Sequence, residues 1–598
     1  MRNCPKCGTS MSENSSICSS CGTSIQGATK EETAASLETQ SYKPPTKLNK
    51  KIWIPAIIFI LLSGTAVSAF FFKKSAKSLY FISEYKSIQQ QTEDWNQLYG
   101  ESIEFQKETL KSPSSTKMEL SGNIETGPAG AVSPETEMLQ EILKEASISV
   151  QADQDPKKKA SYYQTSLNIG KESVDAKLFQ SEKQLGLQIP ALYEKVLYLN
   201  LKEYGEFMRM MDPTYNGPEK LNLSQPNSAE LLLSEKEKAY LAKRYGDFID
   251  KELKDEHFSL EKNVKYEHKG EEMKLRKVSL QLSSEETKAL LLKFLDQLIE
   301  DKKMHNMLWS RADKMIQSSM DEKLQVDSAT FKEELVKGLK KTKSEIKDMK
   351  FPNGFQSDLL IDKKEQIIDR SVKITFNNEV NHVKFDIHTK NIPYDQDKRL
   401  KEIKVEAIDD KKDKVGFNIT NDIDENKEKR KENLAITCLL EKDGNIDTEL
   451  KFKIDSKYKG DPSEKHTVDR DFTFSIKDED SPQISGKVAG KVKQSNDINI
   501  EKKYANQSFD IQMNFDDVDE LEKINLKLDS KSKLKDVQLP SLEKDQKALN
   551  VMKLSDEDIM NIQQEVSINL YELMKKFGLM DPFEEDMNTM ETETYSNL

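Results

Sequence analysis

Four cysteines near the start of the chain have the spacing of a metal site. Two CxxCG turns within CPKCGTSMSENSSICSSCG hold Cys4, Cys7, Cys18 and Cys21. Two such turns offer four thiolates, which suit the tetrahedral geometry that zinc prefers. Because four protein ligands leave no position open for a substrate, the sequence predicts a structural Zn²⁺ ion. About twenty residues cannot bury a useful core, so metal binding would supply the folding energy.

The opening pattern M-x-x-CPxCG resembles the short zinc-ribbon domain at the N-terminus of many bacterial membrane proteins. The matching residues are the same four cysteines, and the likeness covers about the first 75 residues. It implies the order zinc ribbon, polar linker, one transmembrane helix and extracytoplasmic domain. Three other roles fit less well. A thioredoxin-like CxxC needs a βαβ unit, a DNA-binding ribbon needs more basic residues than Arg2 and Lys6, and a lipid-attachment cysteine would follow an apolar segment.

An uncharged apolar segment, IWIPAIIFILLSGTAVSAFFF, occupies residues 52–72. As a helix it would be about 30 Å long, which matches the hydrocarbon core of a membrane. The sequence therefore predicts one transmembrane helix. The alternative is a cleavable signal peptide, because Val67-Ser68-Ala69 has a suitable small-residue pattern. That alternative is disfavoured because the apolar run exceeds the usual length of roughly 7–15 residues.

Cysteine usage predicts how the chain is oriented in the membrane. Lysines flank residues 52–72 equally on both sides, so the positive-inside rule does not decide. Free thiolates persist in a reducing cytosol, whereas only Cys438 follows the apolar segment. The prediction is a single-pass cell-membrane protein with a cytoplasmic N-terminus and an extracytoplasmic C-terminal region. Residues 26–51, which include Pro44-Pro45, are polar and predict a flexible linker.

The composition of the chain limits its class. A chain of 598 residues is too long for one core. It is 33% charged with a net charge of -13, and a surface with this acidic excess is unsuited to neutralising phosphates. We therefore expect no nucleic acid among its partners.

Apolar residues at every second position predict many strands after residue 117. The residues at the positions between them are Lys, Asp, Glu, Asn and Thr. This pattern is typical of an antiparallel sheet with one solvated side. Clear examples are Val174/Ala176/Leu178, Val278/Leu280/Leu282, Val372/Ile374/Phe376, Ile403/Val405, Leu450/Phe452/Ile454, Phe472/Phe474/Ile476 and Phe509/Ile511/Met513/Phe515. Capping boxes predict helix starts at Ser234/Glu237, Ser283/Glu286, Thr330/Glu333 and Ser555/Asp558. The predicted fold class is α+β, with antiparallel sheet and capping helices outside the membrane.

A break at Lys350-Phe351-Pro352-Asn353-Gly354 divides the outer region into two parts. Each part ends in a Leu-Ser-x-Glu-like motif and a helix, so two similar halves are one interpretation. The alternative is coincidence, because capping boxes are common. The predicted domains are a zinc ribbon (1–25), a linker (26–51), a transmembrane helix (52–72), two extracytoplasmic domains (73–350 and 351–580) and a disordered acidic tail (581–598).

No catalytic motif stands out. Ser114 and Lys117 match S-x-x-K by chance, because the partner motifs of penicillin-binding enzymes are absent. The stretch from Gly486 to Lys491 is one residue short of a phosphate loop and fits a strand. His382 and His388 share a strand face but stand apart. Cys438 fits an inert core position. We therefore expect that the chain is not an enzyme.

The sequence thus predicts a membrane-anchored cell-envelope protein with a zinc ribbon inside and a binding or sensory domain outside. Its partners would be the membrane, a protein or hydrophobic ligand outside, and a cytoplasmic protein that meets the ribbon. The alternative function is a carrier or binder of a hydrophobic ligand, built as a half-barrel like those of bacterial lipoprotein and lipid carriers. A packed core produces the same alternation as a cavity, so the sequence does not separate the two.

Overall fold

The computed structural model describes residues 2–3, 10–11, 75–125, 144–221, 231–317, 327–377, 382–395, 397–426, 429–479, 481, 485–516, 522–542 and 547–577. The chain forms two compact units, Met1–Ile54 and Pro55–Leu598. In the first unit, β1 (Arg2–Asn3) pairs with β2 (Ser10–Met11) in antiparallel register. The second unit contains the large sheet and the helices.

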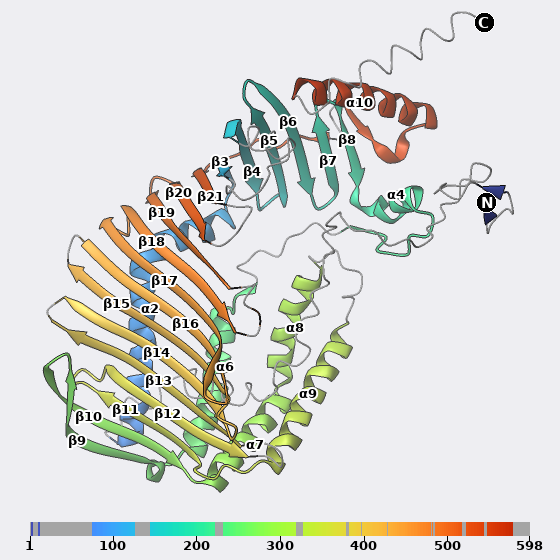
Figure 1. Ribbon diagram of the computed structural model, residues 1–598. Helices are drawn as coiled ribbons and strands as arrows, with labels where there is room; N and C mark the ends of the chain where they lie inside the picture. The colour runs from blue at the N-terminus through green and yellow to red at the C-terminus, as the bar shows by residue number, and fades with distance from the viewer. Residues whose placement is uncertain are drawn as a thin grey trace, which may run out of the picture. The chain divides into compact units, whose positions relative to one another are not determined.

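A single sheet of twenty described strands dominates the second unit (Figure 1). The strands before the helices α7–α9 are β3 (Ser114–Glu125), β4 (Ala146–Asp155), β5 (Ala160–Ile169), β6 (Glu172–Ser181), β7 (Gln184–Ile189), β8 (Tyr193–Asn200), β9 (Phe258–His268) and β10 (Glu271–Leu282). The later strands are β11 (Phe355–Ile361), β12 (Ile367–Asn377), β13 (His382–Tyr394), β14 (Lys398–Asp409), β15 (Lys414–Asn426), β16 (Lys429–Lys442), β17 (Asn445–Gly460), β18 (Lys465–Asp478), β19 (Gly486–Asn499), β20 (Tyr504–Asp516), β21 (Lys523–Leu534) and β22 (Ala548–Asn550).

The pairing of these strands follows the chain with one long-range junction. Consecutive strands pair from β9 to β21, β21 then pairs with β3, and consecutive strands pair again from β3 to β8. All of these pairings are antiparallel, whereas the short β22 pairs with β8 in parallel. The predicted antiparallel arrangement of the strands is confirmed. Short connections join most neighbours in sequence, three helices lie between β10 and β11, and the β21–β3 pairing brings the two ends of the region together.

Seven helices in the described residues accompany the sheet. They are α2 (Ala76–Thr109), α4 (Tyr204–Met211), α6 (Glu235–Glu252), α7 (Ser284–Glu300), α8 (Lys302–Gln317), α9 (Ser328–Asp348) and α10 (Asp556–Lys576). The capping boxes predicted at Ser234, Ser283 and Ser555 are confirmed. The predicted start at Thr330 is wrong, because Asp327 caps α9 by accepting a hydrogen bond from the Thr330 backbone N–H.

Helix α2 lies on one face of the sheet, which we call the inner face. Near its start, Tyr80 Oη and Ser357 Oγ of β11 are 2.7 Å apart in a buried hydrogen bond. In its middle, Asp94 pairs with Lys401 of β14 at 2.5 Å. Near its end, Phe105 packs in a cluster with Ile498 and Ala505 of β19 and β20. The helix therefore crosses the strands from β11 to β20.

The tightest packing of the sheet lies at one end of this crossing. Tyr80 and Phe81 of α2 make edge-to-face contacts with Phe258 of β9. On the neighbouring strands, Leu280 and Leu359 are fully buried. Burial of each such side chain stabilises the fold by about 1.5–3 kcal/mol. The inner face is thus most closely packed where α2 and α7 cover β9–β12, and a smaller buried cluster lies under the end of α2 at β19 and β20.

The predicted division into two similar halves is corrected by the strand pairing. Strand β10 precedes residue 350 and β11 follows it, yet Val278 pairs with Leu359 in one ladder. Gly354 shows why the junction is tight. Its φ is +60°, and a Cβ there would lie 1.9 Å from the carbonyl oxygen of Leu282. The chain therefore enters β11 directly against the end of β10, and both predicted halves belong to one sheet.

In the parts of the chain that the structure describes, no helix combines the length and apolar composition needed to cross a membrane. The predicted transmembrane segment, residues 52–72, lies outside the described residues.

Candidate functional site: an apolar belt on the inner face

A row of apolar side chains crosses seven neighbouring strands of the inner face. Ile403 lies two residues beyond Lys401, which contacts α2, so both side chains are on the inner side. Strand registers then pair residues directly opposite one another across β14–β20. The row is Ile403, Ile419, Ile436, Phe452, Phe474, Val488 and Phe515. Every position in it is apolar.

A second apolar row continues across the long-range junction of the sheet. It begins at Phe509, six residues before Phe515 on the same face of β20. The paired residues across β20, β21, β3, β4, β5 and β6 are Phe509, Leu528, Leu120, Ile148, Leu167 and Val174. We call the two rows together the apolar belt. It crosses twelve strands, which at roughly 4.8 Å per strand makes it about 50 Å long.

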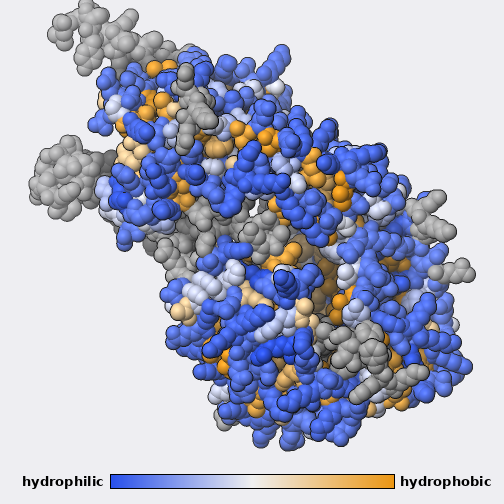
Figure 2. Space-filling view, turned by 180° about the vertical axis from the view of Figure 1, so that it is seen from behind, coloured by the Kyte–Doolittle hydropathy of each residue, from blue (hydrophilic) through white to orange (hydrophobic). Residues whose placement is uncertain are grey.

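The belt is not a packed core. No residue of either row is buried, and Phe474 and Ile148 keep 39% and 40% of their surface exposed. The contrast with β9–β12 has a simple cause, because the covering helices contact mainly that end of the sheet. In the view from behind, hydrophobic residues are seen in a hollow bordered by hydrophilic ones (Figure 2). An exposed apolar surface of this extent marks an interaction site.

Across β14–β16, the opposite, outer face carries charged side chains that form ion pairs with one another. Glu406 of β14 pairs with Lys404 at 2.8 Å and with Lys414 of β15 at 3.1 Å. Lys414 also reaches Glu441 of β16 at 3.2 Å. These side chains alternate with belt residues along the same strands, so the two faces differ sharply in chemistry. The inner face, with its unpaired apolar rows, is therefore the candidate binding face.

A polar network borders the belt near the end of α2. Asn496 of β19 donates a hydrogen bond to His466 Nε2 at 2.7 Å and accepts one from Gln494 at 3.1 Å. Gln494 in turn accepts from Arg470 of β18 at 2.7 Å. His466 and Asn496 are both buried. The network links β18 to β19, which carry Phe474 and Val488 of the belt, and it leaves His466 Nδ1 without a hydrogen-bond partner.

Burial is the main cause that lowers the pKa of His466, and the nearby Arg470 adds to it. Its backbone contact with Asp461 and the charge of that residue act in the opposite direction. A histidine with a lowered folded pKa binds its proton more weakly than the unfolded chain does. Its contribution to stability is therefore present above the ordinary pKa of about 6.5 and is lost as pH falls below it.

We expect the urea midpoint of the full chain to fall when the pH is lowered from above to below about 6.5. The variant His466→Gln should show a smaller fall over the same range. Other carboxylates titrate at lower pH, so the comparison with the variant isolates the histidine. An equal fall in both proteins would contradict the assignment.

Helix α2 adds aromatic side chains on the same side of the sheet as the belt. Trp95 keeps 57% of its surface exposed, and its ring centroid lies 4.6 Å from that of Tyr99. Tyr99 is close enough to interact electrostatically with Tyr458 of β17. Tyr458 shares its strand face with Phe452 of the belt. Trp95 and Tyr99 thus extend the apolar surface from the sheet onto the helix.

The predicted zinc ligands Cys4, Cys7, Cys18 and Cys21 lie outside the described residues. The described β1–β2 pairing joins Arg2 to Met11, and the chain between these two strands carries the first CxxC pair. The zinc site stays a prediction. We expect one zinc ion per purified chain, and elemental analysis would measure this ratio. Within the described ranges, no group of three or more His, Cys, Asp or Glu residues could hold a metal ion.

The structure separates residues that the sequence placed in weak motifs. Ser114 and Lys117 are three positions apart in β3, so their side chains point to opposite faces of the strand. Gly486 to Lys491 belong to β19, as expected for a strand. His388 pairs with Asp369 at 2.7 Å on the outer face. Cys438 of β16 is half-buried and pairs with Phe417 on the inner face, beside the belt.

Sequence analysis identified the strands of the belt but not the belt itself. The alternation in each strand was the available signal, and it correctly assigned Phe474 or Ile403 to an apolar face. Nothing in it indicated that β21 pairs with β3, about four hundred positions away. Nor did it indicate which apolar positions a helix would cover.

No family model matches the chain, and no curated protein matches it. Solved structures do match. A BenF-like porin from Pseudomonas fluorescens Pf-5 is 8% identical, with 71% of this chain and 98% of that chain covered and a TM-score of 0.24. The outer membrane protein OpdK from Pseudomonas aeruginosa is 5% identical, with 70% and 98% covered and a TM-score of 0.22. OccAB4 from Acinetobacter baumannii is 6% identical, with 71% and 98% covered and a TM-score of 0.22.

The observed fold corrects the expected class of protein. The described strands from β3 to β22 form one long sheet, and not the separate α+β domains that the sequence predicts. The predicted α+β fold with one transmembrane helix is therefore withdrawn, whereas zinc binding by the four cysteines, which lie outside the described residues, stays a prediction. Also withdrawn are the single-pass envelope protein with an extracytoplasmic sensory domain, its carrier-like half-barrel alternative, and the single-pass location in the cell membrane. With TM-scores of 0.22–0.24, the matches do not in turn assign a function to this chain.

Proposed function

We propose that the chain is a non-enzymatic binding protein whose apolar belt docks an apolar segment of a partner polypeptide. The observation that carries the proposal is the exposed, in-register belt across twelve strands. Leaving such a surface in water costs free energy in proportion to its apolar area. A partner that covers the belt recovers that free energy on binding.

The form of the belt favours a polypeptide over a small molecule. Small ligands usually bind in concave pockets that bury most of their surface. Two pockets in the described part of the chain lie among helices α6–α9 and share no residue with the belt. The belt is long and shallow, with Trp95 and Tyr99 beside it and the Asn496 network at its border. Aromatic anchors with a polar rim are typical of protein–protein interfaces.

A photo-crosslinking amino acid at position 474 tests this proposal in intact cells. We expect adducts with a partner protein from position 474, and none from position 473, which lies on the outer face of the same strand. The substitution Ile148→Asp, on the second row, should abolish the adduct although it lies far along the belt. Adducts with lipid alone, or with a second copy of the chain, would overturn the proposal. So would an adduct that Ile148→Asp leaves unchanged.

A further inference from the structure

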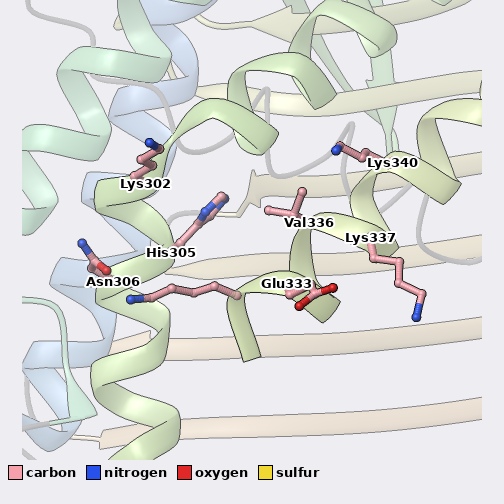
Figure 3. A pocket seen from close by; sticks show the side chains of 8 residues that line it. Lys302, His305, Asn306, Glu333, Val336, Lys337 and Lys340 are labelled. Carbon is pink, nitrogen blue, oxygen red and sulfur yellow. The ribbon is translucent and has the colours of Figure 1, made fainter. Parts of the chain in front are cut away.

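A pocket of about 660 Å³ lies between helices α8 and α9, away from the belt. Helix α8 contributes Lys302, His305 and Asn306, and α9 contributes the rest of the lining. His305 extends from α8 toward α9, and Val336 projects from α9 on the opposite side of the pocket (Figure 3). The pocket is thus framed by two helices that follow one another in the chain.

The lining of this pocket is strongly basic. It holds four lysines and a single acid, namely Lys302, Lys332, Lys337, Lys340 and Glu333. Lys337 is paired with Glu334 at 2.8 Å. No ion pair in the described part of the chain involves Lys302, Lys332 or Lys340. In a chain with a net charge of -13, three unneutralised lysines around one hollow are a concentrated positive site.

His305 adds a buried polar group to the same pocket. It is only 4% exposed, and its Nε2 lies 2.7 Å from the carbonyl oxygen of Leu298. Since a carbonyl oxygen accepts, Nε2 carries the hydrogen. The other ring nitrogen, Nδ1, has no hydrogen-bond partner among the described residues. His305 therefore offers the pocket one ring nitrogen, Nδ1, as a hydrogen-bond acceptor.

A second helical pocket shows that this charge is not a general property of the region. The pocket between α6 and α7, of about 980 Å³, is lined by five basic and four acidic residues. Several of these neutralise one another or a nearby residue, as in Lys243–Asp247 at 2.9 Å and Lys293–Glu252 at 2.5 Å. Of the four lysines that line the α8–α9 pocket, only Lys337 has such an ion pair among the described residues.

We infer that the α8–α9 pocket binds a phosphate group, either of a free phosphate compound or of an anionic lipid headgroup. Lysine ammonium groups bind phosphate as point charges. With Lys337 paired to Glu334, the remaining three lysines and Glu333 leave an excess of two positive charges, which a doubly charged phosphate would balance and a single carboxylate would only halve. The oxygens of a phosphate can also accept hydrogen bonds from several lysines at once.

Titration calorimetry of the full chain with inorganic phosphate and pyrophosphate tests whether the pocket binds free phosphate compounds. Flotation with phosphatidylglycerol vesicles, compared with phosphatidylcholine vesicles, tests whether it binds an anionic lipid headgroup. The double variant Lys332→Gln/Lys340→Gln should weaken whichever interaction is found by about tenfold or more. The matched control is Lys236→Gln/Lys251→Gln, which removes two charges from the α6–α7 pocket and should leave binding unchanged.

Saturable phosphate binding lost only in the first variant supports a site for free phosphate compounds. Vesicle binding lost only in that variant, without phosphate binding, supports a headgroup site. If both double variants weaken binding equally, the loss is explained by the change in net charge alone, and the inference is overturned. Absence of both interactions up to roughly 10 mM phosphate would overturn it as well.

Discussion

Phe474→Asp combined with Ile148→Asp is expected to abolish binding of the partner polypeptide. Each substitution places a carboxylate on one row of the belt, where docking of an apolar segment would bury it without a counter-charge. Each should weaken binding by about tenfold or more, which corresponds to about 1.4 kcal/mol. The measurement is the dissociation constant of the partner identified by crosslinking.

The outer face supplies a matched control for this experiment. Thr473→Asp with Ser149→Asp adds the same charges to the neighbouring positions of the same strands, on the opposite face. Because Phe474 and Ile148 are about 40% exposed and lie outside the buried core, their substitution should change the free energy of unfolding by only about 1 kcal/mol. If the belt variant and the control bind the partner equally well, the belt is not part of the interface.

Glu84→Leu alone is expected to destabilise the fold by about 3–5 kcal/mol, because it leaves the charge of Arg370 buried and unpaired. Glu84 of α2 and Arg370 of β12 form a buried ion pair under the helix. The double variant Glu84→Leu/Arg370→Leu removes both charges and should recover most of the loss. The measurement is the free energy of unfolding in urea of the unmodified chain, the single variant and the double variant.

An exposed ion pair on the same helix provides the control. Lys86 of α2 pairs with Glu365 at 2.7 Å, and about a third of each side chain is exposed. Lys86→Ala should therefore cost less than about 1 kcal/mol. If Glu84→Leu costs no more than Lys86→Ala, or if the double variant is no more stable than the single one, the buried pair does not hold α2 as argued.

Much of the local structure could be predicted from the sequence. Alternation at Leu450/Phe452/Ile454 and at Phe472/Phe474/Ile476 correctly predicted β17 and β18, because the side-chain period of a strand is fixed by its backbone. Ser283 and Glu286 predicted the start of α7, because a cap acts within one turn. The interpretation of two similar halves does not hold, because the break at Lys350–Gly354 is a turn that leads from α9 into β11, and β11 pairs with β10.

The sequence alone determined which residues are apolar, which strand face carries them, and where most of the predicted helices begin. The tertiary structure decided the rest. It joined Leu528 of β21 to Leu120 of β3, and so extended Phe474's row into a belt. It laid α2 across the sheet from β9 to β20 but left Ile403 and Ile148 exposed, and it gathered Lys302 and Lys340 into one pocket. The physical reason is that periodicity and capping are set by neighbours in the chain, whereas lateral pairing and coverage depend on residues hundreds of positions away.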